Sequence, residues 1–178
     1  SYQQLALSRD GQSVAFLACE DSLEADDRYY SLYLGSSTGN DVQMIADTTT
    51  QSIPEDWMVS ENGDLNFSYD GQQLVFGTTP RPLDYTYEED TTILDEERVK
   101  ADIWSWTDPF LQPMQLEQRE DELNRSYAAV YNLGSGSISQ LGTKEVPDIQ
   151  FDDDLRLAYA IGISDLAYRQ QISWDAPF

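Results

Sequence analysis

Two tryptophans, Trp104 and Trp106, are the side chains best suited to recognising a ligand. On an extended strand, residues two positions apart lie on one face, so the two indoles would form an aromatic platform for a peptide or a glycan. The same spacing is typical of residues that pack in a core or between sheets, and packing is the interpretation that we prefer. Trp104 and Trp106 are still the residues that we single out for contact with a peptide or a partner.

Carboxylates are abundant, with 33 Asp and Glu residues against 10 Lys and Arg, but their spacing favours no metal site. Consecutive side chains in Asp152-Asp153-Asp154 point to opposite faces of an extended segment, whereas a calcium loop alternates its acidic residues and ends them with a glycine. We expect a solvated turn there, and neither a metal nor another cofactor in the chain. Some carboxylate pairs must lie within glycosidase distance by chance, which leaves a glycan-processing enzyme open as a third class of function.

Histidine is absent from the chain, which removes the usual general base, the commonest metal ligand and any Ser-His-Asp arrangement. The nucleophile elbow Gly-x-Ser-x-Gly is also missing. The nearest string is Gly134-Ser135-Gly136-Ser137, which lacks the required spacing and is typical of a hairpin turn. We therefore predict no catalytic residue and no enzymatic activity for this chain by itself.

The composition is that of one acidic globular domain. The 178 residues are 40% hydrophobic and 12% aromatic, which is enough for a core, and the formal charge of −23 repels nucleic acid and anionic membrane surfaces. No apolar stretch approaches the roughly 20 residues of a membrane span. The single cysteine, Cys19, excludes an internal disulfide, and within the apolar run 14–19 we expect it to be a small buried hydrophobe.

An internal repeat organises the chain. Residues 8–16 and 68–76 share the pattern Ser-x-Asp-Gly, four residues, then Phe, and each copy follows a short apolar stretch. Asp-Gly between alternating apolar residues predicts a tight turn in a β-hairpin. A degraded third copy places Asp154 at the aspartate position, Leu155 at the glycine and Ala160 at the phenylalanine.

The repeats combine with further hairpins into larger units. Hairpins are expected at 31–45 and 129–141, and two hairpins in succession make a four-stranded antiparallel meander, the unit of a β-propeller blade. We predict an all-β fold, a partial β-propeller of two to three four-stranded antiparallel blades with a short helical insertion. The predicted units are a single domain over 1–178 with a first blade at 1–50, a second at 61–145 and the start of a third at 146–178.

The second predicted blade is irregular. We expect an insertion at 80–101, a strand from Asp102 to Asp108 and a helix at 116–125. Two hairpins, 102–115 and 127–142, then compete for one place in a regular blade, and the sequence leaves the choice open.

The repeat Ser-x-Asp-Gly-x-x-x-x-Phe resembles the blade repeat of TolB-like propellers and of the N-terminal propellers of prolyl oligopeptidase family serine peptidases. Residues 94–109 and 111–115, with the tryptophan pair and Pro113, are similar to a stretch in the propellers of large bacterial members of that family. The segments 124–127 and 168–174 fit the same pattern. In this family the catalytic serine, aspartate and histidine lie in a separate α/β-hydrolase domain, and no triad residue can be carried over to this chain.

The resemblance implies a non-catalytic propeller fragment that screens or positions peptide substrates for a hydrolase domain outside this chain. The implied partners are that hydrolase domain and the peptide substrates. Similar bacterial proteins are often exported, so the resemblance implies a periplasmic or extracellular location, and the residues themselves leave the cytoplasm open. The alternative function is a stand-alone TolB-like protein-binding module with no enzymatic parent.

The ends of the chain also carry an expectation. The chain begins on strand-like sequence without an initiating Met or a signal peptide and stops without an obvious terminal element, so we expect both ends to be cut from a longer polypeptide. A closed propeller needs about four to eight blades, and units this large cannot close a ring in 178 residues. Open sheet edges or blade faces should then lead to self-association.

Overall fold

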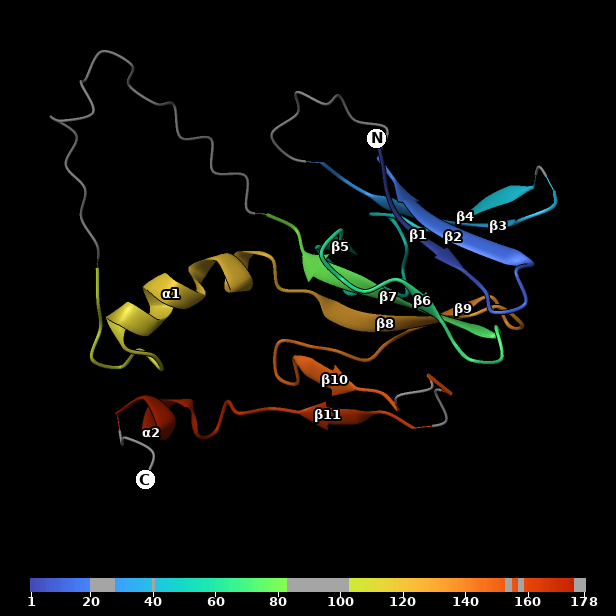
Figure 1. Cartoon of the computed structure of the whole chain (residues 1–178). Coiled ribbons are helices and arrows are strands. Elements are labelled where there is room, and N and C mark those ends of the chain that lie inside the picture. Colours follow the sequence, from blue (N-terminus) through green and yellow to red (C-terminus); the bar gives the residue numbers. More distant parts are fainter. Residues whose placement is uncertain (20–27, 40, 83–102, 153–154, 157–158, 175–178) are drawn as a thin grey trace, which may run out of the picture. The chain divides into compact units, whose positions relative to one another are not determined.

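The computed structural model describes residues 1–19, 28–39, 41–82, 103–152, 155–156 and 159–174 of the chain. The chain divides into two compact units. The first comprises Ser1–Arg81 with Asp121–Ser164, and the second comprises Pro82–Glu120 with Asp165–Phe178. Antiparallel β-sheets dominate the described residues, and the expected all-β class is confirmed (Figure 1).

The first sheet is a four-stranded antiparallel meander in the order β1-β2-β3-β4, drawn in blue to cyan in Figure 1. Its strands are β1 (Tyr2–Leu7), β2 (Ser13–Ala18), β3 (Ser31–Ser36) and β4 (Val42–Ala46). The four strands lie inside the range 1–50, where the sequence predicts two successive hairpins. The prediction succeeds because alternating apolar residues and glycine-containing turns act locally.

The second sheet is built around the long strand β7. Its strands are β5 (Trp57–Val59), β6 (Asn66–Phe67), β7 (Gln73–Pro80), β8 (Tyr127–Asn132) and β9 (Ser137–Gln140). Both β5 and β6 pair with one side of β7, while β8 pairs with the other side and β9 pairs with β8. The hairpin at 127–142 is therefore the one that belongs to this sheet.

Gly77 marks the division between the two short strands that share β7. Val59 of β5 pairs with Thr78, and Asn66 of β6 pairs with Val75, so Gly77 lies between the two pairings. A Cβ atom on Gly77 would come within 2.6 Å of the Cα atom of Gly63, which is in the connection between β5 and β6. Only glycine permits this close approach of two backbones.

The competing hairpin at 102–115 is wrong. Among the described residues of this range, 103–108 contain no strand, and helix α1 (Gln112–Leu123) occupies the second half. The helix predicted at 116–125 is present, but it begins four positions earlier. Pro113 falls in the first turn, where the missing N–H costs nothing, so it permits this earlier start. Most of the predicted insertion at 80–101, from residue 83 on, lies outside the described residues.

The remaining elements are short. β10 (Asp148–Gln150) and β11 (Ile161–Ile163) form an antiparallel pair, and α2 (Arg169–Trp174) follows in the second unit. The predicted start of a third blade at 146–178 therefore contains one hairpin among its described residues. Asp153 and Asp154, which the sequence assigns to a solvated turn, lie outside the described residues.

The core of the first unit draws on both large sheets. Ala15, Leu17 and Leu32 of the first sheet belong to one buried apolar cluster with Leu74 and Phe76 of the second sheet. This packing follows from the period-two pattern, which sends alternate side chains of β2 and β3 to one face.

Cys19 belongs to the same cluster and is buried, as its apolar neighbours predict. Its backbone is also held. The N–H group of Cys19 donates to the carbonyl oxygen of Ser1, and the amino terminus donates back to the Cys19 carbonyl oxygen.

Candidate functional site

Trp104 and Trp106 lie on an irregular turn and not on a strand. Ser105 N–H donates to Asp108 Oδ2 at 3.1 Å, and Thr107 N–H donates to Ser105 Oγ at 3.2 Å. These local hydrogen bonds compete with strand formation and hold a turn instead. Trp104 is 41% and Trp106 is 81% exposed, so neither is packed in a core of the described residues. Packing of these tryptophans between sheets, the other part of our preferred interpretation, stays a prediction. Their predicted contact with a peptide or partner stays a prediction.

The tryptophan turn is tied to the start of α1 within the second unit. Gln115 Nε2 donates to the carbonyl oxygen of Phe110 at 2.8 Å and reaches Asp108 Oδ2 at 3.5 Å. The guanidinium of Arg169 lies 5.3 Å from the centre of the Phe110 ring and pairs with Asp165 at 2.7 Å. The turn is therefore anchored on both sides although its indoles are exposed.

Acidic side chains lie close in sequence to this turn. Glu117 and Glu120 are exposed on α1, and Ile103 beside the turn is almost fully exposed. Exposed indoles bind apolar groups, and they bind cations that lie over the face of the ring. Carboxylates attract the same cations. The chemistry that this surface can support is recognition of an apolar or basic peptide segment.

The second copy of the repeat folds into a hydrogen-bonded turn. The buried Ser68 hydroxyl donates to Asp70 Oδ1 at 2.7 Å and accepts from Gln73 N–H at 2.9 Å. Gln72 N–H donates to the same carboxylate oxygen at 3.0 Å, and Gly71 N–H donates to the Ser68 carbonyl. The Ser68 hydroxyl, and then the Gln72 N–H, hold the pKa of Asp70 below its ordinary value.

The first copy has the same bonds. Ser8 Oγ donates to Asp10 Oδ1 at 2.7 Å and accepts from Ser13 N–H at 2.8 Å, and Gln12 N–H donates to Asp10 Oδ1 at 3.1 Å. The Ser8 hydroxyl, followed by the Gln12 N–H, lowers the pKa of Asp10. The Asp residues of the repeat are thus bound to their own turns, which agrees with a structural role.

In the degraded third copy, Leu155 keeps the backbone conformation and the hydrogen bond of the two glycines. Gly11 and Gly71 have φ angles of +70° and +69°, and Leu155, at the corresponding position, has a φ of +49°. Leu155 N–H donates to the carbonyl oxygen of Asp152, as each glycine does to its serine. Leucine rarely adopts a left-handed conformation, so contacts from outside the turn must hold it there.

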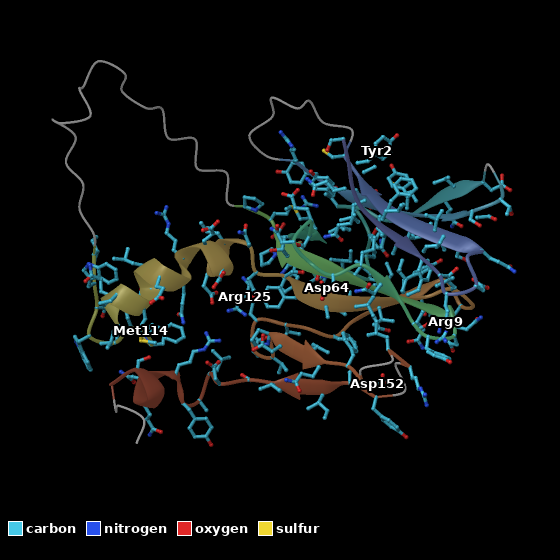
Figure 2. All side chains as sticks on the ribbon, in the orientation of Figure 1. Tyr2, Arg9, Asp64, Met114, Arg125 and Asp152 are labelled. Atoms are coloured by element: carbon cyan, nitrogen blue, oxygen red, sulfur yellow. The ribbon has the colours of Figure 1, made fainter. Side chains whose placement is uncertain are left out.

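Such contacts exist, because the described residues of the three repeat copies lie side by side. A Cβ atom on Gly71 would be 3.9 Å from the Cβ atom of Ser8, and Tyr69 N–H donates to the Leu155 carbonyl oxygen at 3.0 Å. The guanidinium carbons of Arg9 and Arg156 lie 4.0 Å and 5.6 Å from the Tyr69 ring centre. Figure 2 shows Arg9 and Asp152 at the same end of the first unit.

Sequence reasoning missed this cluster. Arg9 and Tyr69 occupy the variable position of the Ser-x-Asp-Gly pattern, and a variable position gives no signal. The one available signal is the alignment of the third copy, which places Leu155 beside the two glycines.

A hollow of about 360 Å³ lies in the first unit beside β7 and β10, near Asp64 and Arg125 in Figure 2. Its polar lining includes Asp64, Ser126 and Asp148. Arg125 lies 3.8 Å from Asp148, and its hydrogen bonds to the Glu122 carboxylate raise its pKa. The hollow can accept a cationic or hydrogen-bonding group, but no activated nucleophile is evident in its lining.

Within the described part of the chain, no cluster of three or more His, Cys, Asp or Glu residues is arranged to hold a metal ion. None of the described helices has the length and apolar character needed to cross a membrane. No protein-family model matches the chain, and no curated protein sequence is significantly similar to it.

Proposed function

We propose that this chain is a non-catalytic segment of a β-propeller whose parent is a serine peptidase similar to prolyl oligopeptidase. In this proposal the segment positions peptide substrates for a hydrolase domain outside the chain. The observation that carries the propeller part is the row of three repeat turns. In a propeller, successive sheets of one topology bring equivalent turns to the same end, next to one another.

The buried apolar cluster that the two large sheets share supports the same proposal. Adjacent propeller blades bury apolar faces against each other, and here Leu17 and Leu32 share a cluster with Leu74 and Phe76. In the first sheet one strand, β1, pairs with β2. In the second sheet two short strands, β5 and β6, pair with β7 in the same way, and this is a local variation on the meander.

The peptide-positioning part of the proposal rests on the tryptophan turn. Trp104 and Trp106 are exposed on an anchored turn, and exposed carboxylates on α1 are close to it in sequence. We expect binding of proline-containing peptides with basic residues, because indoles contact both the proline ring and a guanidinium face. With no histidine in the chain, the peptides should be bound without being cleaved.

Titration of fluorescently labelled peptides tests this function. Peptides of about ten residues with proline and arginine should bind with dissociation constants in the micromolar to millimolar range. Trp106→Ala should weaken binding about tenfold or more, since exposed aromatic contacts often carry an interface. Tyr159→Ala is the matched control, because Tyr159 is 88% exposed in the other unit.

Two results would contradict the proposal: binding that is unchanged in Trp106→Ala, or cleavage of the bound peptides by this chain alone. Reading the gene on both sides of the 178 residues tests the parent. A downstream Gly-x-Ser-x-Gly followed by Asp and His would support the peptidase. A gene without them would favour the stand-alone binding module.

A further inference from the structure

The first sheet has an outer face, on the side away from the buried cluster, that is apolar across all four strands. Strand pairing places one residue of each strand in a row across the sheet, and a second row lies beside it. The first row is Leu5, Phe16, Tyr33 and Met44, and the second is Leu7, Val14, Gly35 and Val42. Tyr2 joins them, with its ring centre 5.8 Å from that of Phe16.

Much of this outer face is uncovered. Tyr2 is 80% exposed, Leu5 75% and Leu7 60%, and at the opposite edge Val42 and Met44 are about half exposed. The inner face of the same sheet packs against the core, since Ala15, Leu17 and Leu32 are buried there. Soluble monomers rarely expose a contiguous apolar patch larger than a few hundred Å², so this face is expected to be an interface.

The absence of charged side chains on this outer face limits which kind of partner can bind it. None of the side chains in the two rows is charged, although the chain carries a formal charge of −23. A basic peptide or nucleic acid would find no ion pair there, so the complementary surface must itself be apolar and as flat as a sheet. Among the described residues, the second sheet is not a comparable surface, because β10 contacts its strand β8. The surface that meets this description is the same outer face of a second copy.

A two-fold axis would bring the two outer faces together with the same rows in contact. The sheets would then lie about 10 Å apart, as sheets do in β-sandwiches. The exposed parts of these side chains would bury roughly 500–600 Å² on each copy, which just exceeds the total of about 1,000 Å² that a specific interface needs. The recess of about 440 Å³ lined by Tyr2, Gln3, Gln4, Leu5 and Phe16 leaves room for a side chain of the partner.

We propose that the outer face of the β1–β4 sheet pairs with the same face of a second copy to give a symmetric dimer. The inference goes beyond the proposed function and concerns this chain by itself, because in the proposed parent propeller a neighbouring blade would cover the same sheet face. Each copy is strongly negative, so the copies repel one another until salt screens them. The dimer should therefore strengthen as the salt concentration rises.

Sedimentation velocity between about 1 and 500 µM tests the dimer. The wild-type chain should change from monomer to dimer over this range, with a smaller dissociation constant at about 0.5 M than at about 0.05 M NaCl. Leu5→Glu and Met44→Glu should each raise the dissociation constant at least about tenfold, because each buries an unpaired charge on both copies. Leu123→Glu is the matched control: Leu123 is 73% exposed on α1, and the substitution should change the constant less than about twofold.

Far-UV circular dichroism checks that the variants fold, and Leu5→Ser replaces Leu5→Glu if the charged variant unfolds. A chain that remains monomeric at every concentration and salt level would overturn the inference. A dimer that persists unchanged in the folded face variants would also overturn it, since the contact would then lie on another surface. Peptide binding through Trp106 should be unchanged in Leu5→Glu, so failure of the proposed function is seen separately.

Discussion

At the scale of the residue, the serine of the repeat contributes as much as the Asp-Gly pair after it. Ser8 and Ser68 are buried, and each hydroxyl closes its turn with one donated and one accepted hydrogen bond. Sequence analysis treats the Asp and Gly as the turn-formers. The structure adds the serine, because its hydroxyl accepts a hydrogen bond from the N–H group of the first residue of the next strand, Ser13 or Gln73. This bond forms only when the hairpin closes.

Ser68→Ala should lower the free energy of unfolding by about 1–2 kcal/mol, because Gln73 N–H loses its buried acceptor. Urea unfolding followed by circular dichroism measures this change. Ser36→Ala at the exposed end of β3 is the control, and its effect should stay within about 0.5 kcal/mol. Equal effects of the two substitutions would contradict the role that we assign to Ser68.

Asp10 and Asp70 should make part of the stability depend on pH. Their pKa values are lowered in the folded state from the ordinary 3.8, so their contribution is present above that value and is lost as the pH falls through the lowered values. The double variant Asp10→Asn, Asp70→Asn should therefore lose less unfolding free energy than the wild type between about pH 5 and pH 3. Parallel stability curves for the two proteins would refute the prediction.

At the scale of the element, local patterns explain what the sequence predicted, and competing or distant contacts explain what it missed. The meander β1–β4 is predictable because alternation and glycine-containing turns act over a few residues. The strand at 102–108 fails because Ser105 and Asp108 bond within the segment. The left-handed Leu155 could not be foreseen, because the bond from Tyr69 comes from another turn.

Gly77, which separates the pairings of β5 and β6 along β7, gives an element-scale prediction. A methyl group there would lie 2.6 Å from the Gly63 Cα atom and 2.2 Å from Ser126 Oγ. Gly77→Ala should therefore cost about 2–4 kcal/mol of unfolding free energy and separate β5 and β6 from β7. Gly134→Ala is the control, because its nearest neighbour is 3.4 Å away. Amide hydrogen exchange of Ser60, which donates to the Gly77 carbonyl, should accelerate in Gly77→Ala only.

At the scale of the whole molecule, the negative charge and the exposed apolar face have opposite effects on the association of two copies. The formal charge of −23 keeps copies apart, while the outer face of the first sheet favours bringing two of them together. The sequence predicts that faces or edges lead to self-association. It could not select the face, because the bulge in β1 between Gln3 and Leu5 decides which side Tyr2 takes.

Because Cys19 is buried, the rate at which its thiol is labelled reports on local opening of the protein. Cys19 is the one thiol of the chain, it is 5% exposed, and its backbone is bonded to the first residue. A thiol reagent can reach it only while the edge of the first sheet is open, so the labelling rate reports how often that edge opens. Labelling should be at least about a hundredfold slower than in denaturant. Slower labelling at higher protein concentration would show that assembly holds β1 in place.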